Sequence, residues 1–161
     1  MIEIKKLDQE LWQAYRALRL EALQKEPLAF GDSYEESKDR PENVWRSRID
    51  NFIFALDENK PAGMIGLYQE GTKSKHVINI FSVYVKKEYR GQGIGKKLME
   101  AVLTQIKINQ NIIKIKLAVN PAQEAAVKLY QSFGFKITGT FKKELCVEGK
   151  YYDELLMEKY Y

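Results

Sequence analysis

A glycine-rich segment between a strand-like run and a helix-like run is the feature that most constrains how this chain can fold. It reads Arg90-Gly91-Gln92-Gly93-Ile94-Gly95-Lys96. Residues 77–85 before it are nearly all apolar or β-branched, which is typical of a buried strand. Residues 94–106 after it repeat an apolar side chain at helical spacing. A glycine turn at such a junction frees backbone N–H groups at a helix N-terminus, where they can bind a phosphate group.

Two common phosphate-binding motifs do not fit this segment. A Walker loop needs Ser or Thr after Gly-Lys, but Lys97 follows Lys96. A dinucleotide fingerprint needs G-x-G-x-x-G, whereas the glycines here alternate with single residues. The pattern that fits is R-x-x-G-x-G, formed by Arg90, Gly93 and Gly95.

Hydrophobic periodicity and turn residues predict the element order β-α-α-β-β-β-α-β-α-β-β. The strands are expected at residues 2–7, 52–56, 61–68, 77–85, 113–119, 135–147 and 151–160. Asp8 should cap the first helix, and Pro41 should lie in the first turn of the second. Asn120 should cap the last helix, with Gly134 ending it. Residues 69–75 are expected to form a polar loop.

The central strand–helix–strand unit must be a right-handed parallel crossover, and the remaining connections favour antiparallel neighbours. We therefore expect an α/β (α+β) fold with a mixed, mostly antiparallel sheet around one parallel unit. No linker, repeat or low-complexity stretch divides the sequence, so residues 1–161 should form a single domain.

Composition excludes several classes of protein. No apolar run approaches 18 residues, and the N-terminus lacks a signal-peptide core, so neither a membrane span nor a secreted chain is expected. One cysteine, Cys146, permits no internal disulfide, which suits the cytoplasm. With His76 as the only histidine, no metal site is expected. The net charge of +4 suits ordinary solubility or attraction to a polyanionic cofactor. The sequence has no arginine-rich tract of the kind that would indicate nucleic-acid binding.

The R-x-x-G-x-G pattern, with Val83 and Val85 on the strand before it, resembles the coenzyme A motif of the GNAT superfamily of N-acetyltransferases. Residues 118–135, with Ala-Val-Asn-Pro and Leu-Tyr-Gln-Ser-Phe-Gly-Phe, resemble the second signature of that family. Residues 28–36 and 149–157 are similar to patterns in bacterial amino-group acetyltransferases. The resemblance covers nearly the whole chain and implies the GNAT fold.

The resemblance also implies a co-substrate, acetyl-CoA, and the residues that hold it, with no metal ion. The pantetheine arm would pair with the backbone at Val83, Tyr84 and Val85. The residues implied at the pyrophosphate are Arg90, Gly91, Gln92, Gly93, Ile94, Gly95 and Lys96. Asn120 would hydrogen-bond the arm, although a cap role alone explains it. Tyr130 would protonate the departing thiolate as the catalytic residue, although its spacing also suits core packing.

The general base is not identified by the sequence. Histone-acetylating members of the family hold a glutamate where this chain has Asn79, which cannot accept a proton. Glu35, Glu36, Glu70 and Asp153 are candidates, but each also suits a solvated surface charge. An amine of pKa about 10.4 is almost fully protonated at neutral pH, whereas an α-amino group near 7.8 is substantially free. The missing glutamate therefore favours a low-pKa amine or a water relay.

We expect an N-acetyltransferase that moves an acetyl group from acetyl-CoA to a primary amine by direct attack in a ternary complex. The lone Cys146 argues against a covalent acyl-enzyme. The acceptor should be a small molecule or a terminal amine. The resemblance implies that it contacts residues 28–40 and 141–151, because these segments flank the cofactor cleft in that family. Neither nucleic acid nor membrane is an expected partner, and a homodimer is left open. The alternatives are a non-catalytic acyl-CoA-binding module that senses or regulates, and a nucleic-acid-associated protein with salt-dependent binding.

Overall fold

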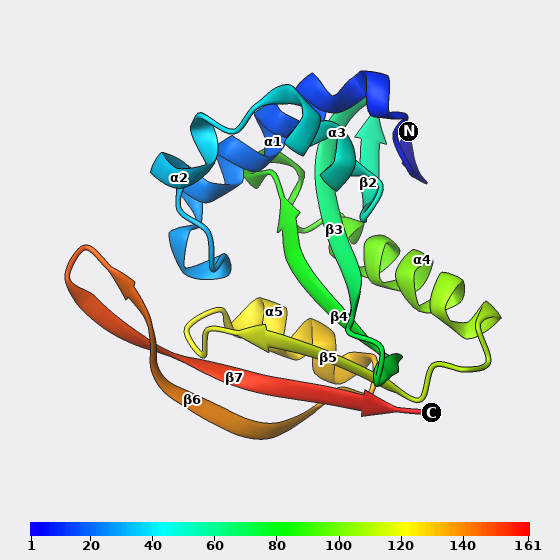
Figure 1. The fold of residues 1–161 in the computed structure, drawn as a ribbon, viewed down its shortest axis with the longest axis vertical. Helices are drawn as coiled ribbons and strands as arrows, with labels where there is room; N and C mark the ends of the chain where they lie inside the picture. The colour runs from blue at the N-terminus through cyan, green and yellow to red at the C-terminus, as the bar shows by residue number, and fades with distance from the viewer.

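The computed structural model describes residues 1–161 as one seven-stranded sheet with helices on both faces (Figure 1). The strands are β1 (Ile2–Lys5), β2 (Phe52–Asp57), β3 (Lys60–Glu70), β4 (Ser74–Val85), β5 (Lys114–Val119), β6 (Lys136–Val147) and β7 (Lys150–Tyr160). The α-helices are α1 (Trp12–Lys25), α2 (Tyr34–Lys38), α3 (Glu42–Ile49), α4 (Ile94–Ile108) and α5 (Glu124–Ser132). Three short 3₁₀ turns lie at Gln9–Leu11, Pro27–Ala29 and Lys87–Tyr89.

The strand order is β1-β2-β3-β4-β5-β7-β6. Every neighbouring pair is antiparallel except β4 and β5, which run parallel and are joined through α4. The expectation of a mostly antiparallel sheet around one parallel strand–helix–strand unit is therefore confirmed.

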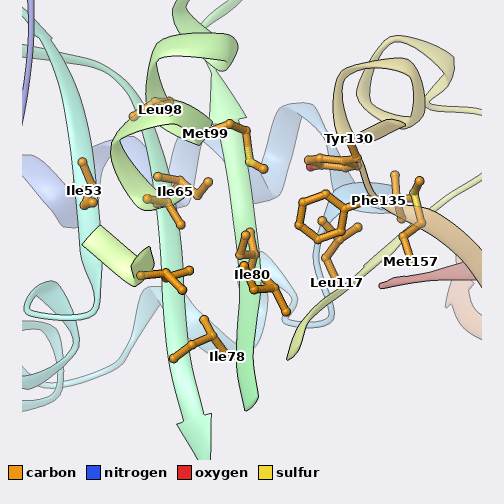
Figure 2. Packing of buried hydrophobic residues seen from close by; sticks show 14 of the residues in the cluster. Ile53, Ile65, Ile78, Ile80, Leu98, Met99, Leu117, Tyr130, Phe135 and Met157 are labelled. Carbon is orange, nitrogen blue, oxygen red and sulfur yellow. The ribbon is translucent and has the colours of Figure 1, made fainter. Parts of the chain in front are cut away.

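Two apolar clusters cover the two faces of the sheet. Alternation along β2 divides its side chains between them, because Ile53 and Ala55 join one cluster while Phe52 and Phe54 join the other. The first cluster lies under α4 and α5 and extends across the sheet to Met157 (Figure 2). The second lies under α1 and α3 and is rich in packed aromatic rings.

The parallel pairing between β4 and β5 is short. It joins Val77–Lys114, Ile78–Ile115 and Asn79–Lys116 and then stops. Beyond that point the two strands diverge, as Figure 1 shows. A bulge in β4 accompanies the divergence, with Ser82 at a φ of +52° where the register with β3 shifts. The edge of β4 that faces β5 therefore has no strand partner from residue 80 to residue 85.

The start of α5 differs from the prediction. Asn120 does not cap this helix, because α5 begins at Glu124 with Gln123 in the N-cap position. The Asn120 Oδ1 instead accepts a hydrogen bond from the backbone N–H of Ala122 at 2.8 Å. Such a local turn competes with capping, and here it adds a non-helical segment between β5 and α5. Gly134, at a φ of +88°, does follow the end of the helix as expected.

Other helix and strand boundaries also differ from the prediction. Asp8 caps the 3₁₀ turn before α1 rather than α1 itself, and Pro41 is the N-cap residue of α3 rather than part of its first turn. Helix α2 was not predicted, since its five residues are too few to show periodicity. The expected polar loop after β3 is shorter, because β3 continues to Glu70 and β4 begins at Ser74. None of the helices is both long and apolar enough to cross a membrane.

Candidate active site

The glycine loop before α4 presents a row of free backbone donors. Gly91 and Gly93 have φ angles of +77° and +75°, which L-residues with side chains rarely adopt. None of the backbone N–H groups of residues 91–96 donates a hydrogen bond to a protein acceptor, and the helix ladder starts with Lys97 bonded to Gly93. The positive end of the helix dipole lies at the same place. This loop is therefore built to bind an anion.

The same loop forms one wall of a cleft of about 820 Å³, which we call the glycine-loop cleft. The other walls come from β4, the end of β5 and the start of α5. Of the residues that the sequence assigned to the cofactor, those lining this cleft are Val83, Tyr84, Val85, Arg90, Gly91, Gly93, Ile94, Gly95 and Lys96. A Cβ atom added at Gly91 or Gly93 would meet no atom within 4 Å, so side chains here would enter open space.

Two of the assigned residues do not line the cleft. The Gln92 side chain is exposed and donates to the backbone oxygen of Glu88 at 3.2 Å. Asn120 is only 3% exposed, and its side chain is held between Ala122 and the backbone oxygen of Asp153. Asn120 fixes the β5–α5 turn against β7, and its contact with a cofactor arm stays a prediction.

Arg90 is tied to the protein rather than left free. Its Nε donates to the backbone oxygen of Val85 at 2.9 Å, and its Nη2 pairs with Glu26 at 2.7 Å. The side chain thus fixes the end of β4 to the C-terminal end of α1. Lys96 is less constrained, because its only ion pair is with Glu100 at 3.9 Å. Of these two cations, Lys96 is therefore the freer to contact an anion.

Tyr130 of α5 lines the glycine-loop cleft although it is only 5% exposed. Its ring packs edge-on against Phe135 at a centroid distance of 6.2 Å, and Figure 2 shows the two rings together. The hydroxyl makes no hydrogen bond within the protein. Burial raises the pKa of Tyr130 above its ordinary value, so the phenol keeps its proton and can act as a hydrogen-bond donor.

A second cleft of about 840 Å³ lies beside the first, and we call it the charged cleft. It is lined by the loop before α2, by β4 and β5, and by the β6–β7 hairpin. The two clefts share residues 80–82 of β4 and residues 117–119 of β5. They therefore meet where β4 and β5 diverge. Of the expected acceptor region, residues 28–32, Phe141 and Glu144 line the charged cleft, and residues 33–40 do not.

Three arginines converge on one carboxylate at the edge of the charged cleft. The Asp32 Oδ2 accepts from Arg19 at 3.1 Å, Arg40 at 3.2 Å and Arg48 at 3.4 Å. Arg19 is 2% exposed and also donates to the Ser82 hydroxyl at the β4 bulge. Burial alone would raise the pKa of Asp32, but the hydrogen bond from Arg40 and the charge of Arg19 outweigh it and hold the pKa below its ordinary value.

Three of the four candidate bases named from the sequence line neither cleft. Asp153 accepts from the backbone N–H of Lys143, and Glu35 pairs with Lys38 on the surface. Glu36 is exposed on α2. Only Glu70 lines the charged cleft, where it pairs with Lys116 at 3.5 Å.

Three further polar groups line the charged cleft. Asn79 is 7% exposed, and its Nδ2 has no hydrogen-bond partner. Glu144 and Glu154, which sequence reasoning missed, line the same cleft without any ion pair. The sequence feature that could have pointed to Glu154 is the alternation of side chains along β7. It places Glu154 on the same face as Leu156, which also lines the cleft.

Comparison with known proteins identifies the family. The model of the acetyltransferase (GNAT) family matches residues 5–135. The chain belongs to the GNAT acetyltransferase family. It is 37% identical to N-acetyltransferase 8 of Homo sapiens over 90 residues, which are 55% of this chain and 39% of that protein. The chain thus spans about two fifths of the length of that curated relative.

Solved GNAT proteins share the whole fold. An acetyltransferase of the GNAT family from Streptococcus pneumoniae superimposes with a TM-score of 0.89 at 22% identity, covering 100% of both chains. The protein yncA from Salmonella typhimurium, solved with its cofactor acetyl-CoA, gives a TM-score of 0.83 at 16% identity over 99% of this chain and 94% of that one. At these identities the likeness establishes the fold alone.

The glycine-loop cleft fits the chemistry of coenzyme A, which combines a pyrophosphate with an arm carrying two amides. Six consecutive N–H donors at a helix N-terminus match the pyrophosphate. The unpaired edge of β4 offers backbone groups that amides can pair with. No group of three His, Cys, Asp or Glu side chains is placed to hold a metal ion.

Replacing Asp32 with asparagine should destabilise the protein, because Arg19 would stay buried without its carboxylate. We expect the free energy of unfolding at pH 7 to fall by about 2 kcal/mol, because Arg19 is buried but Asp32 is partly exposed to solvent. The folded-state pKa of Asp32 lies below its ordinary value, so its contribution is fully present above the ordinary pKa and is lost as pH falls through the folded pKa. Urea denaturation at pH 7 and at acid pH measures both effects.

The exposed Asp39, which forms no ion pair, provides the matched control Asp39→Asn. Its stability should stay within about 0.5 kcal/mol of the original at every pH. An Asp32→Asn variant as stable at pH 7 as Asp39→Asn would contradict a structural role for the arginine cluster.

Proposed function

We propose that this chain transfers an acetyl group from acetyl-CoA to a primary amine. The observation that carries the proposal is the row of unpaired N–H groups at residues 91–96, which opens into a cleft large enough for an extended cofactor arm. Membership of the GNAT family supports it, as does the Salmonella relative solved with acetyl-CoA.

In this proposal each wall of the glycine-loop cleft has its own task. Residues 91–96 bind the pyrophosphate through backbone N–H groups, and Lys96 adds a positive charge. The free edge of β4 at Val83 and Val85 pairs with the amides of the arm, as an added strand would. Arg90 holds β4 against α1, so that this edge stays in place.

The two clefts support direct attack in a ternary complex. They meet at residues 80–82 and 117–119, so an amine in the charged cleft can reach a thioester placed at the end of the glycine-loop cleft. Cys146 is an exposed free thiol on β6 and lines neither cleft, which argues against an acyl-enzyme on it. A free thiol suits the proposed cytoplasmic location, where cysteines stay reduced.

Tyr130 assists the departing sulfur mainly as a hydrogen-bond donor. A thiol has a pKa near 8.5, and a phenol at or above 10 would lose at least about 2 kcal/mol by giving up its proton completely to the thiolate. Because burial raises the pKa of Tyr130 further, early and complete transfer is unfavourable. A donated hydrogen bond still stabilises the negative charge that develops on sulfur.

An amine panel tests the proposal directly. We expect acetyl-CoA to release free thiol only when an acceptor is added, and the panel should include small amines and peptides with free amino termini. Thiol release and the mass of the acetylated product are measured together. Acetyl-CoA binding without acceptor-stimulated turnover on any amine would instead favour a sensing module.

Replacing Gly93 with valine should weaken acetyl-CoA binding. The side chain would enter the cleft and force a left-handed backbone onto a β-branched residue. We expect at least about tenfold weaker binding, which is 1.4 kcal/mol, by calorimetric titration. Gly149→Val is the matched control, because Gly149 has a φ of +74°, open space around it and a place in the β6–β7 turn. Equal affinity of the two variants for acetyl-CoA would show that the glycine loop is not part of the cofactor site.

Replacing Tyr130 with phenylalanine should lower kcat and leave acetyl-CoA affinity unchanged. The ring keeps its packing against Phe135, and only the donor is lost. We expect a loss of about 100-fold, the lower end for removing one hydrogen-bond donor to a developing negative charge. Tyr160→Phe, an exposed site at the end of β7, is the control. An unchanged kcat, with single-turnover kinetics showing that chemistry is rate-limiting, would leave Tyr130 with a packing role only.

A further inference from the structure

The charged cleft contains one pair of carboxylates that the protein does not neutralise. Asp32 is surrounded by three arginines, and Glu70 pairs with Lys116. The side chains of Glu144 and Glu154, by contrast, make no ion pair and no hydrogen bond with a protein group, although both residues line the cleft. Glu154 is partly buried, whereas Glu144 is exposed. Two neighbouring carboxylates without a cation leave a negative site open toward the ligand.

Glu154 lies at the junction of the two clefts. In the register of β5 with β7, Val119 pairs with Leu155 and Ala118 pairs with Leu156, so Glu154 lies one residue past the last pair. Ala118 and Val119 line both clefts. Glu154 shares the face of Leu156 and therefore points to the charged-cleft side of the sheet.

An independent observation indicates that a ligand belongs in this cleft. The Asn79 side chain is 7% exposed and lines the cleft, yet its Nδ2 has no partner. A buried amide donor is costly when unpaired, so an acceptor atom supplied by water or by a ligand is required there. The cleft thus carries an unneutralised pair of carboxylates together with a lining residue whose buried amide donor lacks a protein partner.

We infer that the Glu154 carboxylate receives the ammonium group of the acceptor and takes its proton before the attack. The inference rests on the proposed acetyl transfer and adds the acceptor class: an alkyl ammonium ion without a carboxylate beside its nitrogen, because Glu144 and Glu154 would repel one. This replaces the preference for a low-pKa amine that Asn79 suggested from the sequence.

The protons and bonds in this step balance. Glu154 takes one proton from the ammonium, and the freed nitrogen lone pair forms the bond to the thioester carbon. The carbon–sulfur bond breaks, and sulfur leaves with its electron pair. The nitrogen gives up a second proton, which ends on the sulfur with Tyr130 donating a hydrogen bond to it. The proton on Glu154 then leaves to solvent through the open cleft, so that each turnover releases one proton.

The surroundings of Glu154 suit this role. Burial, and after it the charge of Glu144, raise the pKa of Glu154 above its ordinary value and so make it a stronger base. The other charged groups lining the cleft are Arg19, Asp32, Arg48, Glu70 and Lys116. Lys116 is already paired with Glu70, and Arg19 and Arg48 with Asp32. None of these cations forms an ion pair with Glu154.

The test compares Glu154→Gln with the original enzyme on the best amine of the panel. Near neutral pH we expect kcat/KM to fall by about 100-fold or more, as for loss of a general base. The pH profile of kcat/KM tests whether Glu154 is the base. In the original enzyme log kcat/KM should rise through the pKa of Glu154 and then level off. In Glu154→Gln it should rise with unit slope up to the pKa of the amine, since only the free amine reacts.

Two more variants make the result specific. Glu144→Gln should move the acidic limb to lower pH, because it removes the neighbouring charge that raises the pKa of Glu154. Glu3→Gln, at an exposed site on β1 at the far edge of the sheet, should leave rate and profile unchanged. Calorimetric titration of each variant with acetyl-CoA should give the original affinity.

The outcomes separate the inference from the function it rests on. An original enzyme that acetylates no amine would overturn the proposed function. An active original enzyme together with a Glu154→Gln variant that keeps its rate would overturn the inference alone. A variant that is slower but keeps the original pH profile would overturn it too, because a merely structural role lowers the rate without moving the acidic limb.

Discussion

The short pairing between β4 and β5 is the constraint on which the rest of the structure depends. Three residue pairs join the strands, and then the strands diverge. Backbone groups inside a sheet are normally paired, so a gap between adjacent strands leaves donors and acceptors that only water or a ligand can satisfy. Both clefts open from this gap and share its residues. The divergence thus leaves an unpaired edge of β4, to which we assign the cofactor arm, and brings the two clefts together.

Arg19 links that divergence to the acceptor side. Its guanidinium lies under the bulge of β4 and donates to Ser82, which holds a φ of +52°. It also pairs with Asp32 in the loop before α2, and its charge lies 5.0 Å from the centre of the Phe30 ring. A strained residue persists only where its surroundings hold it. One buried cation therefore holds both the bulge that opens the sheet and the loop that borders the charged cleft.

The sequence predicts most of the strands because they are buried on one or both faces, and burial leaves a readable pattern. Strand β6 has no buried residue and is predicted instead from the turn residues that join it to β7. The glycine loop is predicted for a related reason, since only glycine adopts its left-handed angles easily at Gly91 and Gly93. Asn120 misled the prediction because its side chain suits a helix cap and a local turn equally well. Glu154 was missed because a carboxylate on a strand looks like a surface charge until the neighbouring strands show which face it shares.

Burial raises the pKa of both Tyr130 and Glu154, and the same direction has opposite consequences for the two groups. A phenol with a raised pKa becomes a poorer acid and keeps its proton, so in the proposed function it donates a hydrogen bond to a developing thiolate. A carboxyl with a raised pKa becomes a better base, so it can hold a proton from an ammonium ion. Tyr130 lines only the glycine-loop cleft and Glu154 only the charged cleft. In the proposed reaction, desolvation on the two sides of one gap in the sheet thus favours a donor toward the leaving sulfur and an acceptor toward the attacking nitrogen.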